Sequence, residues 1–206
     1  MFYRTDENRH GLPHDPFKAI VTPRPIGWIS TRSKAGTVNL APYSYFNAVS
    51  DRPKLVMFSS AGMKDSASFA IESGEFVANL ATMALAKALV RSSAPAPRGV
   101  SEFAIAGLTE ADCELVAAPR VAESPAVLEC KVTEWFWPKG LDGQPSANVM
   151  VIGEVVGIHL DESILTDGMI DPALSQPLAR LGYLDYAGSS AAFQLARPRL
   201  PDASDI

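Results

Sequence analysis

The sequence is poor in the residues that build disulfide frameworks and metal centres. Its 206 residues include only two cysteines and three histidines. Cys113 and Cys130 lie far apart and belong to no CxxC pair, so neither a disulfide framework nor a zinc site is expected. His10 and His14 are separated by glycine and proline, which disfavour a helical ligand pair, and His159 stands alone. We therefore expect no metal ligand and two buried thiols in a reducing cytoplasm.

The chain also lacks an excess of basic residues and any long apolar run. Its 18 lysines and arginines are outnumbered by 23 acidic residues, for a formal charge of −5, which argues against a dedicated nucleic-acid binder. No stretch approaches the roughly 20 apolar residues that cross a bilayer. Charges near Met1 occupy the place where a signal peptide has its apolar region. We expect a cytoplasmic protein that binds neither nucleic acid nor membrane.

Several common catalytic motifs are missing as well. The sequence contains no HExxH, GxSxG, P-loop or GxGxxG motif, so the corresponding peptidases, hydrolases and Rossmann dinucleotide enzymes lose their main signal. At 22.0 kDa, one domain with a substantial core is the natural expectation.

What the chain does have is a series of strand-sized apolar segments. Residues 26–31 and 37–50 flank a polar, glycine-containing turn at 33–36, which predicts a hairpin. Residues 55–58, after a second turn at 51–53, extend it with a third strand.

Weaker patterns predict the other elements. A helix over 67–73 would begin at an N-cap, Asp65 or Ser66, and stop at Gly74. Many short strands with few helices fit a closed or nearly closed antiparallel barrel. The remaining expected elements are a strand over 75–80, helices over 83–92 and 173–181, and a hairpin of strands over 126–137 and 148–160.

Polar side chains interrupt the first hairpin where core positions are expected. They are Asn39, Tyr43, Ser44, Tyr45 and Asn47. Buried polar groups are costly unless they are paired. The segment therefore either satisfies its own backbone or faces a polar ligand.

The same segment carries a family resemblance. The runs PRPIGWIST (23–31), NLAPYSYFN (39–47) and KDS (64–66) resemble the flavin reductase-like family of FMN-binding split β-barrels. That family includes reductase components of two-component monooxygenases and flavoredoxin-type electron carriers. The resemblance continues through EFVANL (75–80), SEFAIAGL (101–108) and RLGYLDY (180–186), and so spans most of the chain.

The resemblance implies a fold and a domain plan. The expected fold is a β-rich α+β, Greek-key, FMN-binding split antiparallel β-barrel with a few flanking helices. One domain would cover residues 1–206, with an N-terminal extension over 1–18 that lies across the barrel and a C-terminal tail over 187–206.

The resemblance also suggests where the FMN phosphate would bind. Ser59, Ser60, Lys64, Asp65 and Ser66 offer hydroxyls, a cation and a predicted helix amino end, which suit a phosphate. Taken alone, the segment is equally a serine-rich connection with a capping aspartate and a solvated lysine. Its match to the family's phosphate-binding position favours the ligand.

The flavin ring would lie along the middle of the hairpin, with an apolar floor and hydrogen bonds to its polar edge. The alternative is that the three aromatic residues are simply barrel core with locally paired hydroxyls. The residues assigned to the ring are Asn39, Ala41, Pro42, Tyr43, Ser44, Tyr45, Phe46 and Asn47.

Four further cofactor contacts, and Arg98 as an additional candidate, are expected on weaker grounds. Arg24, held between two prolines, suits a fixed charge near a phosphate or a dimer partner, or a solvent-facing arginine. Asn79, and also Arg98, could equally serve structure alone. Arg180 and Gly182 match a family element that closes over the flavin from the neighbouring subunit.

The resemblance implies an FMN-dependent NAD(P)H:flavin oxidoreductase that takes hydride from NADH or NADPH. It would form a homodimer and supply reduced flavin to a partner monooxygenase component. We name no catalytic side chain, because the cofactor carries the chemistry of hydride transfer. The alternatives are a flavoredoxin-like FMN-binding electron carrier without nicotinamide oxidase activity, and a ligand-free structural barrel.

Overall fold

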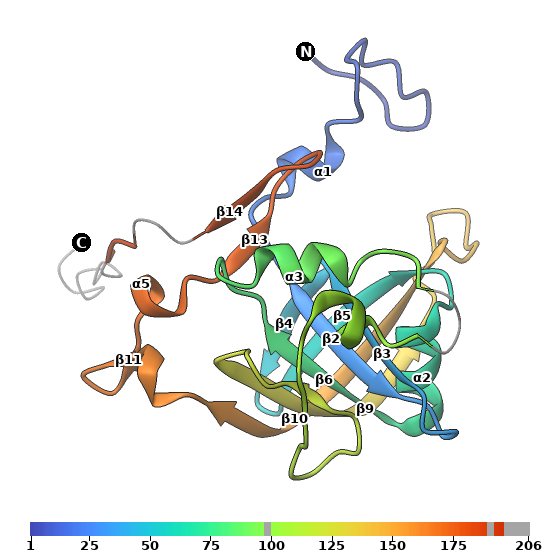
Figure 1. The fold of residues 1–206 in the computed structure, drawn as a ribbon. Helices are drawn as coiled ribbons and strands as arrows, with labels where there is room; N and C mark the ends of the chain where they lie inside the picture. Colours follow the sequence, from blue (N-terminus) through green and yellow to red (C-terminus); the bar gives the residue numbers. More distant parts are fainter. Residues whose placement is uncertain (97–99, 189–191, 196–206) are drawn as a thin grey trace, which may run out of the picture.

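The computed structural model describes residues 1–96, 100–188 and 192–195 (Figure 1). None of the described helices is long and apolar enough to span a membrane. In chain order the elements are α1 (Phe17–Ile20), β1 (Arg24–Pro25), β2 (Gly27–Arg32), β3 (Val38–Tyr43), β4 (Phe46–Asp51), β5 (Lys54–Ala61), α2 (Asp65–Ser73), β6 (Glu75–Leu80), α3 (Ala86–Arg91), α4 (Glu102–Ala106), β7 (Glu110–Ala111), β8 (Arg120–Val121), β9 (Ala126–Phe136), β10 (Asn148–Leu160), the 3-10 helix η1 (Glu162–Ile164), β11 (Leu165–Thr166), β12 (Met169–Ile170), α5 (Pro172–Ser175), β13 (Leu178–Arg180) and β14 (Tyr186–Gly188).

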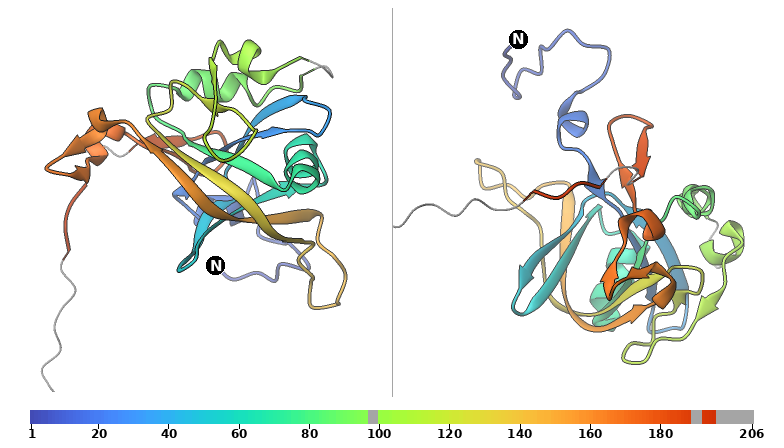
Figure 2. Two further views of the ribbon diagram at one scale, coloured as in Figure 1. Left: turned by 90° about the horizontal axis from the view of Figure 1, so that it is seen from below. Right: turned by 90° about the vertical axis from the view of Figure 1, so that its left-hand side faces the viewer.

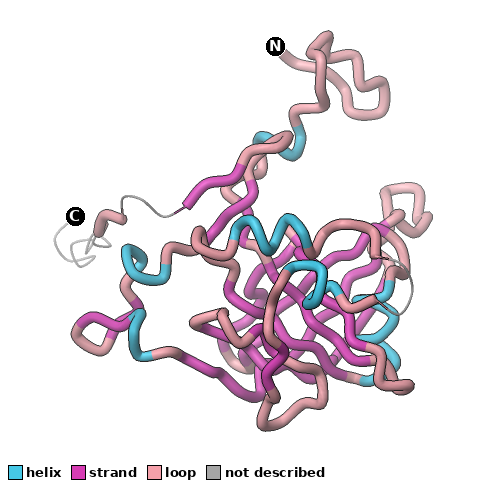
Figure 3. The backbone as a smooth tube through the Cα atoms, in the orientation of Figure 1, coloured by secondary structure: helices cyan, strands magenta, loops and turns pink. Residues whose placement is uncertain are grey.

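A curled seven-stranded sheet forms the body of the molecule (Figures 1 and 3). Its order is β3-β2-β6-β9-β10-β5-β4, and every neighbouring pair is antiparallel. Apolar side chains from strands all round the sheet, among them Ile29, Phe58, Phe76 and Val151, are fully buried in one core cluster. The predicted β-rich α+β fold is confirmed.

The two edge strands of this sheet are almost consecutive in sequence. Strand β3 ends at Tyr43 and β4 begins at Phe46, yet the two strands lie at opposite ends of the sheet order. Three Cα steps span at most about 11 Å, so the sheet has to curl until its edges nearly meet at Ser44 and Tyr45. The expectation of one strand over 37–50 is therefore wrong, because the chain changes edge at this point.

The predicted hairpins are confirmed. Strand β2 pairs with β3 from Gly27↔Tyr43 to Arg32↔Val38. Strands β9 and β10 pair over almost their full length, with irregularities after Ile152 and after Val155. Such bulges bend a strand and increase its twist, as closure of a barrel requires.

The helices cover different parts of the sheet. Helix α2 buries Ala67 and Ala70 against the core cluster inside the curled sheet. Helices α3 and α4 bury Leu89 and Phe103 in a second cluster, around Trp28 of β2. The helix expected over 83–92 is shorter in the structure, and α4 lies in a segment for which no helix was expected.

The amino end of α2 differs from the prediction. Its N-cap is Lys64, which makes no side-chain capping hydrogen bond, so neither Asp65 nor Ser66 caps the helix. The carboxyl end is as predicted, since Gly74 adopts the left-handed conformation at φ 77°.

The helix expected over 173–181 is wrong. Helix α5 ends after one turn at Gln176, which has φ 40°, and Pro177 follows, which cannot donate the next helical hydrogen bond. The chain then forms β13, which pairs with β1 and β14 in a separate three-stranded sheet.

Two parts of the chain leave the barrel as arms: residues 1–23 form the N-terminal arm and residues 161–188 form the C-terminal arm (Figures 1 and 2). Figure 2 shows residues 1–16 reaching away from the seven-stranded sheet, so the expectation that the N-terminal extension lies across the barrel is not met. The segment carrying β11, β12 and α5 projects from the barrel as well (Figures 1 and 2).

A loop on the outer face of β6 and β9 is held by buried polar side chains. Glu75 accepts hydrogen bonds from the Ala117 and Ala118 amides at 2.5 and 3.3 Å. Glu129 accepts hydrogen bonds from the Glu114 and Leu115 amides at 2.9 and 2.6 Å. These bonds fix the loop over 112–118, because a buried carboxylate that loses its partners is strongly destabilising.

Gly153 tests how tightly the barrel interior is packed. A Cβ at this position would lie 2.5 Å from Cε1 of the fully buried Phe76. We predict that Gly153→Ala lowers the free energy of unfolding, measured in urea, by about 1–3 kcal/mol through overpacking. The loss should shrink in a Phe76→Leu background, and equal losses in both backgrounds would contradict the packing argument.

Candidate functional site

A groove runs along β3 to the amino end of α2. Its volume is about 520 Å³. Seven of the predicted contacts meet here. Four come from β3, one is the N-cap residue of α2, and two lie in the first turn of α2. The groove is lined by Asn39, Ala41, Pro42, Tyr43, Lys64, Asp65, Ser66, Ser92, Ser93, Ala94, Pro95, Ala96 and Glu102.

The amino end of α2 offers uncapped donors to this β3–α2 groove. The side chain of the N-cap residue, Lys64, makes no capping hydrogen bond. The first amides of a helix have no hydrogen-bond partner within the helix. Because the helix dipole also makes this end electropositive, it suits an anion. The Lys64 side chain is exposed beside it and adds a mobile positive charge.

A chain of hydrogen bonds fixes the polar side chains behind the groove. The Ser66 hydroxyl donates to Asn39 Oδ1 at 2.5 Å. Asn39 Nδ2 donates to Glu102 Oε1 at 3.2 Å, and the Leu40 amide donates to Glu102 Oε2 at 3.1 Å. Both ends of the Asn39 amide are thus engaged within the protein, which makes Asn39 a positioning residue of the groove wall.

Tyr43 stands at the centre of the groove wall. Its ring packs against Phe58, with centroids 5.0 Å apart. Burial raises the pKa of the Tyr43 hydroxyl, and hydrogen bonds with Ser66 and Ser60 oppose that shift. The hydroxyl therefore stays protonated at neutral pH and is available as a donor.

The sequence analysis missed one side of the groove. Glu102 and the segment from Ser92 to Ala96 line it opposite the first turn of α2. The signal in the sequence was slight, since residues 101–108 matched the family without indicating which side chain faces the groove. Glu102 lies in the first turn of α4 and reaches back to β3. Arg98 lies outside the described residues.

A second cavity of about 810 Å³ adjoins the groove, and Pro42 and Ser93 line both. Three further predicted contacts, Arg24, Ser44 and Arg180, line this second cavity. We call it the Arg24 cavity.

Arg24 is held by the two arms of the chain. Its guanidinium donates to the carbonyl oxygens of Lys18, Val21 and Leu181, the last at 2.8 Å. The side chain is buried, and its Nε is without a hydrogen-bond partner among the described residues. Arg24 thus connects the N-terminal and C-terminal arms and is not solvent-facing.

Arg180 and Gly182 lie in the C-terminal arm. The Arg180 guanidinium sits 4.4 Å from the centre of the Tyr186 ring and donates to the Tyr183 carbonyl. A Cβ at Gly182 would lie 2.5 Å from the Cβ of Ala19. The glycine therefore serves the close contact between the two arms.

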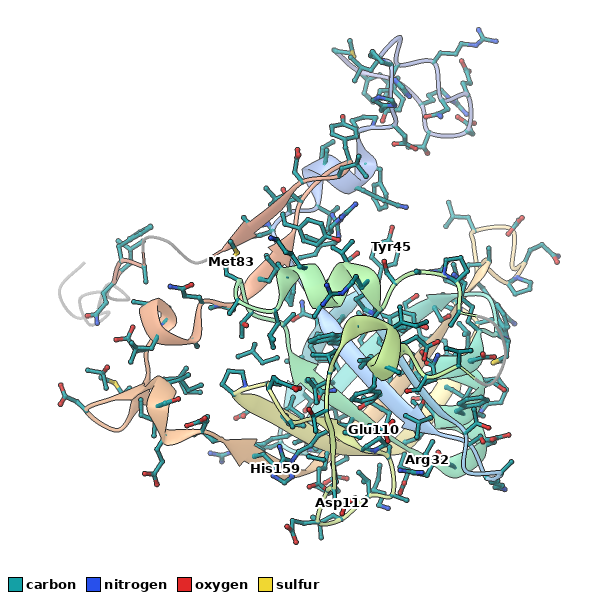
Figure 4. The ribbon with its side chains drawn as sticks, viewed as in Figure 1. Arg32, Tyr45, Met83, Glu110, Asp112 and His159 are labelled. Carbon is teal, nitrogen blue, oxygen red and sulfur yellow. The ribbon has the colours of Figure 1, made fainter. Side chains whose placement is uncertain are left out.

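The remaining predicted contacts do not line the β3–α2 groove, although Ser60 hydrogen-bonds to the Tyr43 hydroxyl. Ser59 accepts from Asn148 at 3.0 Å, and Ser60 donates to the Gly62 carbonyl at 2.8 Å. Asn47 is exposed on β4, and Tyr45 lies at the corner between β3 and β4 (Figure 4).

Phe46 and Asn79 line a separate apolar cavity of about 550 Å³. Asn79 donates to the Trp28 carbonyl at 2.9 Å and accepts from the Val121 amide at 2.8 Å. Its amide therefore has a structural role, which the sequence analysis left open.

Comparison with known proteins identifies the family of the chain. Residues 20–179 match the model of the flavin reductase like domain. The chain belongs to the flavin reductase-like family. An uncharacterized protein of Halalkalibacterium halodurans is 38% identical over 185 residues, which cover 87% of this chain and 88% of the relative.

Two solved structures show the fold. Nitrilotriacetate monooxygenase component B from Bacillus cereus is 30% identical, with a TM-score of 0.85 over 95% of this chain and 98% of that one. A protein with a split barrel domain from Shewanella frigidimarina is 21% identical, with a TM-score of 0.77 over 98% of this chain and 100% of that one. The predicted split barrel is thereby confirmed.

Lys64 provides a test of the groove. We predict that Lys64→Ala weakens FMN binding by about tenfold, the worth of one charge-assisted hydrogen bond to the phosphate. Riboflavin, which has no phosphate, should bind the variant and the wild type equally, as measured by flavin fluorescence titration.

The matched control is Lys87→Ala, which removes an exposed lysine on α3 outside the groove lining. An equal loss for FMN and riboflavin, or no loss for FMN, would contradict the phosphate assignment.

Proposed function

We propose that the chain is an FMN-dependent NAD(P)H:flavin oxidoreductase whose FMN binds in the β3–α2 groove. One observation carries the proposal. The uncapped amino end of α2, with Lys64 beside it, opens into a groove along the strand that carries the family's residues. The family match over residues 20–179 supports the same conclusion.

The residues of the groove fit the parts of a flavin mononucleotide. The α2 amides and Lys64 provide cationic and N–H donors for a phosphate. Ala41 and Pro42 expose strand backbone over small side chains, against which a flat ring can lie. Tyr43, held against Phe58, gives the groove an aromatic wall.

When bound, FMN supplies the redox chemistry by accepting a hydride from a nicotinamide. The protein's own part is to position the ring, to control the access of water and to fix the polar edge of the groove. The hydrogen bonds that join Glu102, Asn39 and Ser66 hold the groove wall in place. No side-chain acid or base is required for this role.

The Arg24 cavity is the proposed entrance for the nicotinamide donor. It opens beside the groove at Pro42 and Ser93. Two cations, Lys18 and Arg180, line it with one acidic residue, Asp15, and the cations favour a substrate that carries phosphates.

Anaerobic mixing with nicotinamides tests the reductase activity. Stopped-flow mixing of the FMN-loaded protein with NADH, and separately with NADPH, should bleach the visible flavin absorbance with at least one donor. Protein mixed with buffer alone is the control.

Two other outcomes lead to other conclusions. Bleaching by a reduced electron-transfer protein, with neither nicotinamide active, would support the flavoredoxin-like carrier. A protein that stays colourless after incubation with FMN would leave only the structural barrel.

The similarity to nitrilotriacetate monooxygenase component B supports a further step of the proposal. We propose that the reduced flavin passes to a separate monooxygenase component.

The two cysteines are free and unpaired with each other, as suits a reducing cytoplasm.

We also propose that the protein is a homodimer. The arms expose large apolar side chains, among them Phe17, Ile20, Met169 and Leu184, and exposed apolar surface of this kind is typical of an interface. Sedimentation of the FMN-loaded protein at micromolar concentration should show a dimer.

A monomer under these conditions would refute the dimer proposal. As a matched comparison, Ile20→Glu on the arm should weaken the dimer more than Val49→Glu, which changes an exposed apolar residue on β4.

A further inference from the structure

We propose that Cys113, Glu129 and His159 form a binding site for a divalent metal ion of the zinc class. The three residues come from the loop between β7 and β8, from β9 and from β10. None of them lines the β3–α2 groove, so this Cys–Glu–His cluster is separate from the proposed flavin site. Figure 4 shows His159 at the edge of the barrel, on the side of the loop that carries Asp112.

The geometry of the cluster is close to that of a metal centre. One ligand atom of each residue lies within 4.8 Å of the other two. Ligand atoms 2.0–2.3 Å from a tetrahedral zinc ion lie roughly 3.5 Å from one another, so small movements of side chains complete the set. Three protein ligands with a fourth position left to water is a common arrangement for zinc.

The backbone makes room for the cluster at Gly157. This glycine pairs with Glu129 across an irregularity in the register of β9 and β10. A Cβ at Gly157 would lie 3.3 Å from Cδ1 of Leu115 and 3.4 Å from Cδ of Glu129. Any larger residue would press on both the carboxylate and the loop that carries Cys113.

Hydrogen bonds already hold the Glu129 carboxylate in one orientation, as neighbouring groups do for the ligands of known metal sites. The Glu129 side chain is 1% exposed. Its two oxygens accept the Glu114 and Leu115 amides, and Oε1 lies 2.5 Å from His159 Nε2. Hydrogen bonds of this kind hold metal ligands in place in known sites, and the metal would take the position of the proton between His159 and Glu129.

The charge around the thiol favours a cation. The carboxylate of Glu129 lies within 4.8 Å of the Cys113 sulfur and of the His159 ring nitrogen. A buried carboxylate attracts a divalent ion, and a thiol that coordinates such an ion is deprotonated by it.

The proton balance of binding is simple. The Cys113 thiol releases its proton to solvent and binds as thiolate. The metal replaces the proton on Nε2 of the neutral His159 ring, and a proton is taken up on Nδ1 instead, so the ring stays neutral when it binds. Glu129 binds as carboxylate, so the site gains the metal and loses one thiol proton.

Residue spacing does not indicate this site, because its ligands come from three separate segments of the chain. We expected no metal ligand and two buried thiols from the sequence; Cys130 is buried, whereas Cys113 is only half-buried and lies beside His159. The three segments would be joined by the ion, which would tie the loop over 112–118 to β9 and β10.

Cobalt is the most direct probe, since Co²⁺ replaces Zn²⁺ and absorbs light. We expect the chelator-treated chain, prepared without an affinity tag, to bind one equivalent of Co²⁺ with a thiolate-to-cobalt charge-transfer band. Cys113→Ser should lose the band. Since Cys130 is the other thiol of the chain, a band that persists in Cys113→Ser would overturn the proposal.

His159 provides a second variant and a matched control. His159→Gln should weaken Co²⁺ binding by more than about tenfold, the loss that even an outer-shell change can cause, whereas His14→Gln on the N-terminal arm should not. Far-ultraviolet circular dichroism and riboflavin binding check that each variant is folded. Equal affinities for His159→Gln and the wild type, or no stoichiometric binding by the wild type, would also overturn the proposal.

Discussion

The junction at Ser44 and Tyr45 is the constraint on which the rest of the architecture depends. It joins strands that lie at opposite edges of a seven-stranded sheet. Because the connection is only two residues long, the two edges of the sheet have to stay close together. The same junction ends β3 beside α2 and starts β4 beside β5. The β3–α2 groove therefore lies where the barrel closes, and its wall is as rigid as the closure itself.

Buried polar residues in this barrel stabilise the fold as well as lining the candidate site. Glu75, Glu129 and Asn79 are buried, and each accepts a backbone amide of the 112–121 loop. Each bond is modest on its own, but losing a partner in a buried place is costly. Hydrogen bonds, together with a small apolar cluster around Val77 and Val116, hold the loop to the sheet, which explains how it can bring Cys113 to a fixed place.

The sequence was most informative where signals were local. The 126–160 hairpin, the first hairpin and the Gly74 helix stop follow from turn residues and strand runs within short windows. The prediction of a helix over 173–181 was wrong, because the chain turns at Gln176 and then pairs as β13 with β1, which lies far away in the sequence. Glu102 could not be assigned either, since its partners on β3 lie more than sixty positions away.

The uncapped start of α2 is best understood as a compromise between stability and binding. A serine or aspartate cap would stabilise the helix by about 1 kcal/mol. Ser66 instead turns inward to Asn39, and no side chain caps the helix at Lys64. A cap would occupy the very amides that an anion requires. Asp65 and Ser66, which we expected as caps, therefore leave the amino end of the helix open. A bound phosphate would accept hydrogen bonds from the uncapped amides and stabilise the helix in place of a cap.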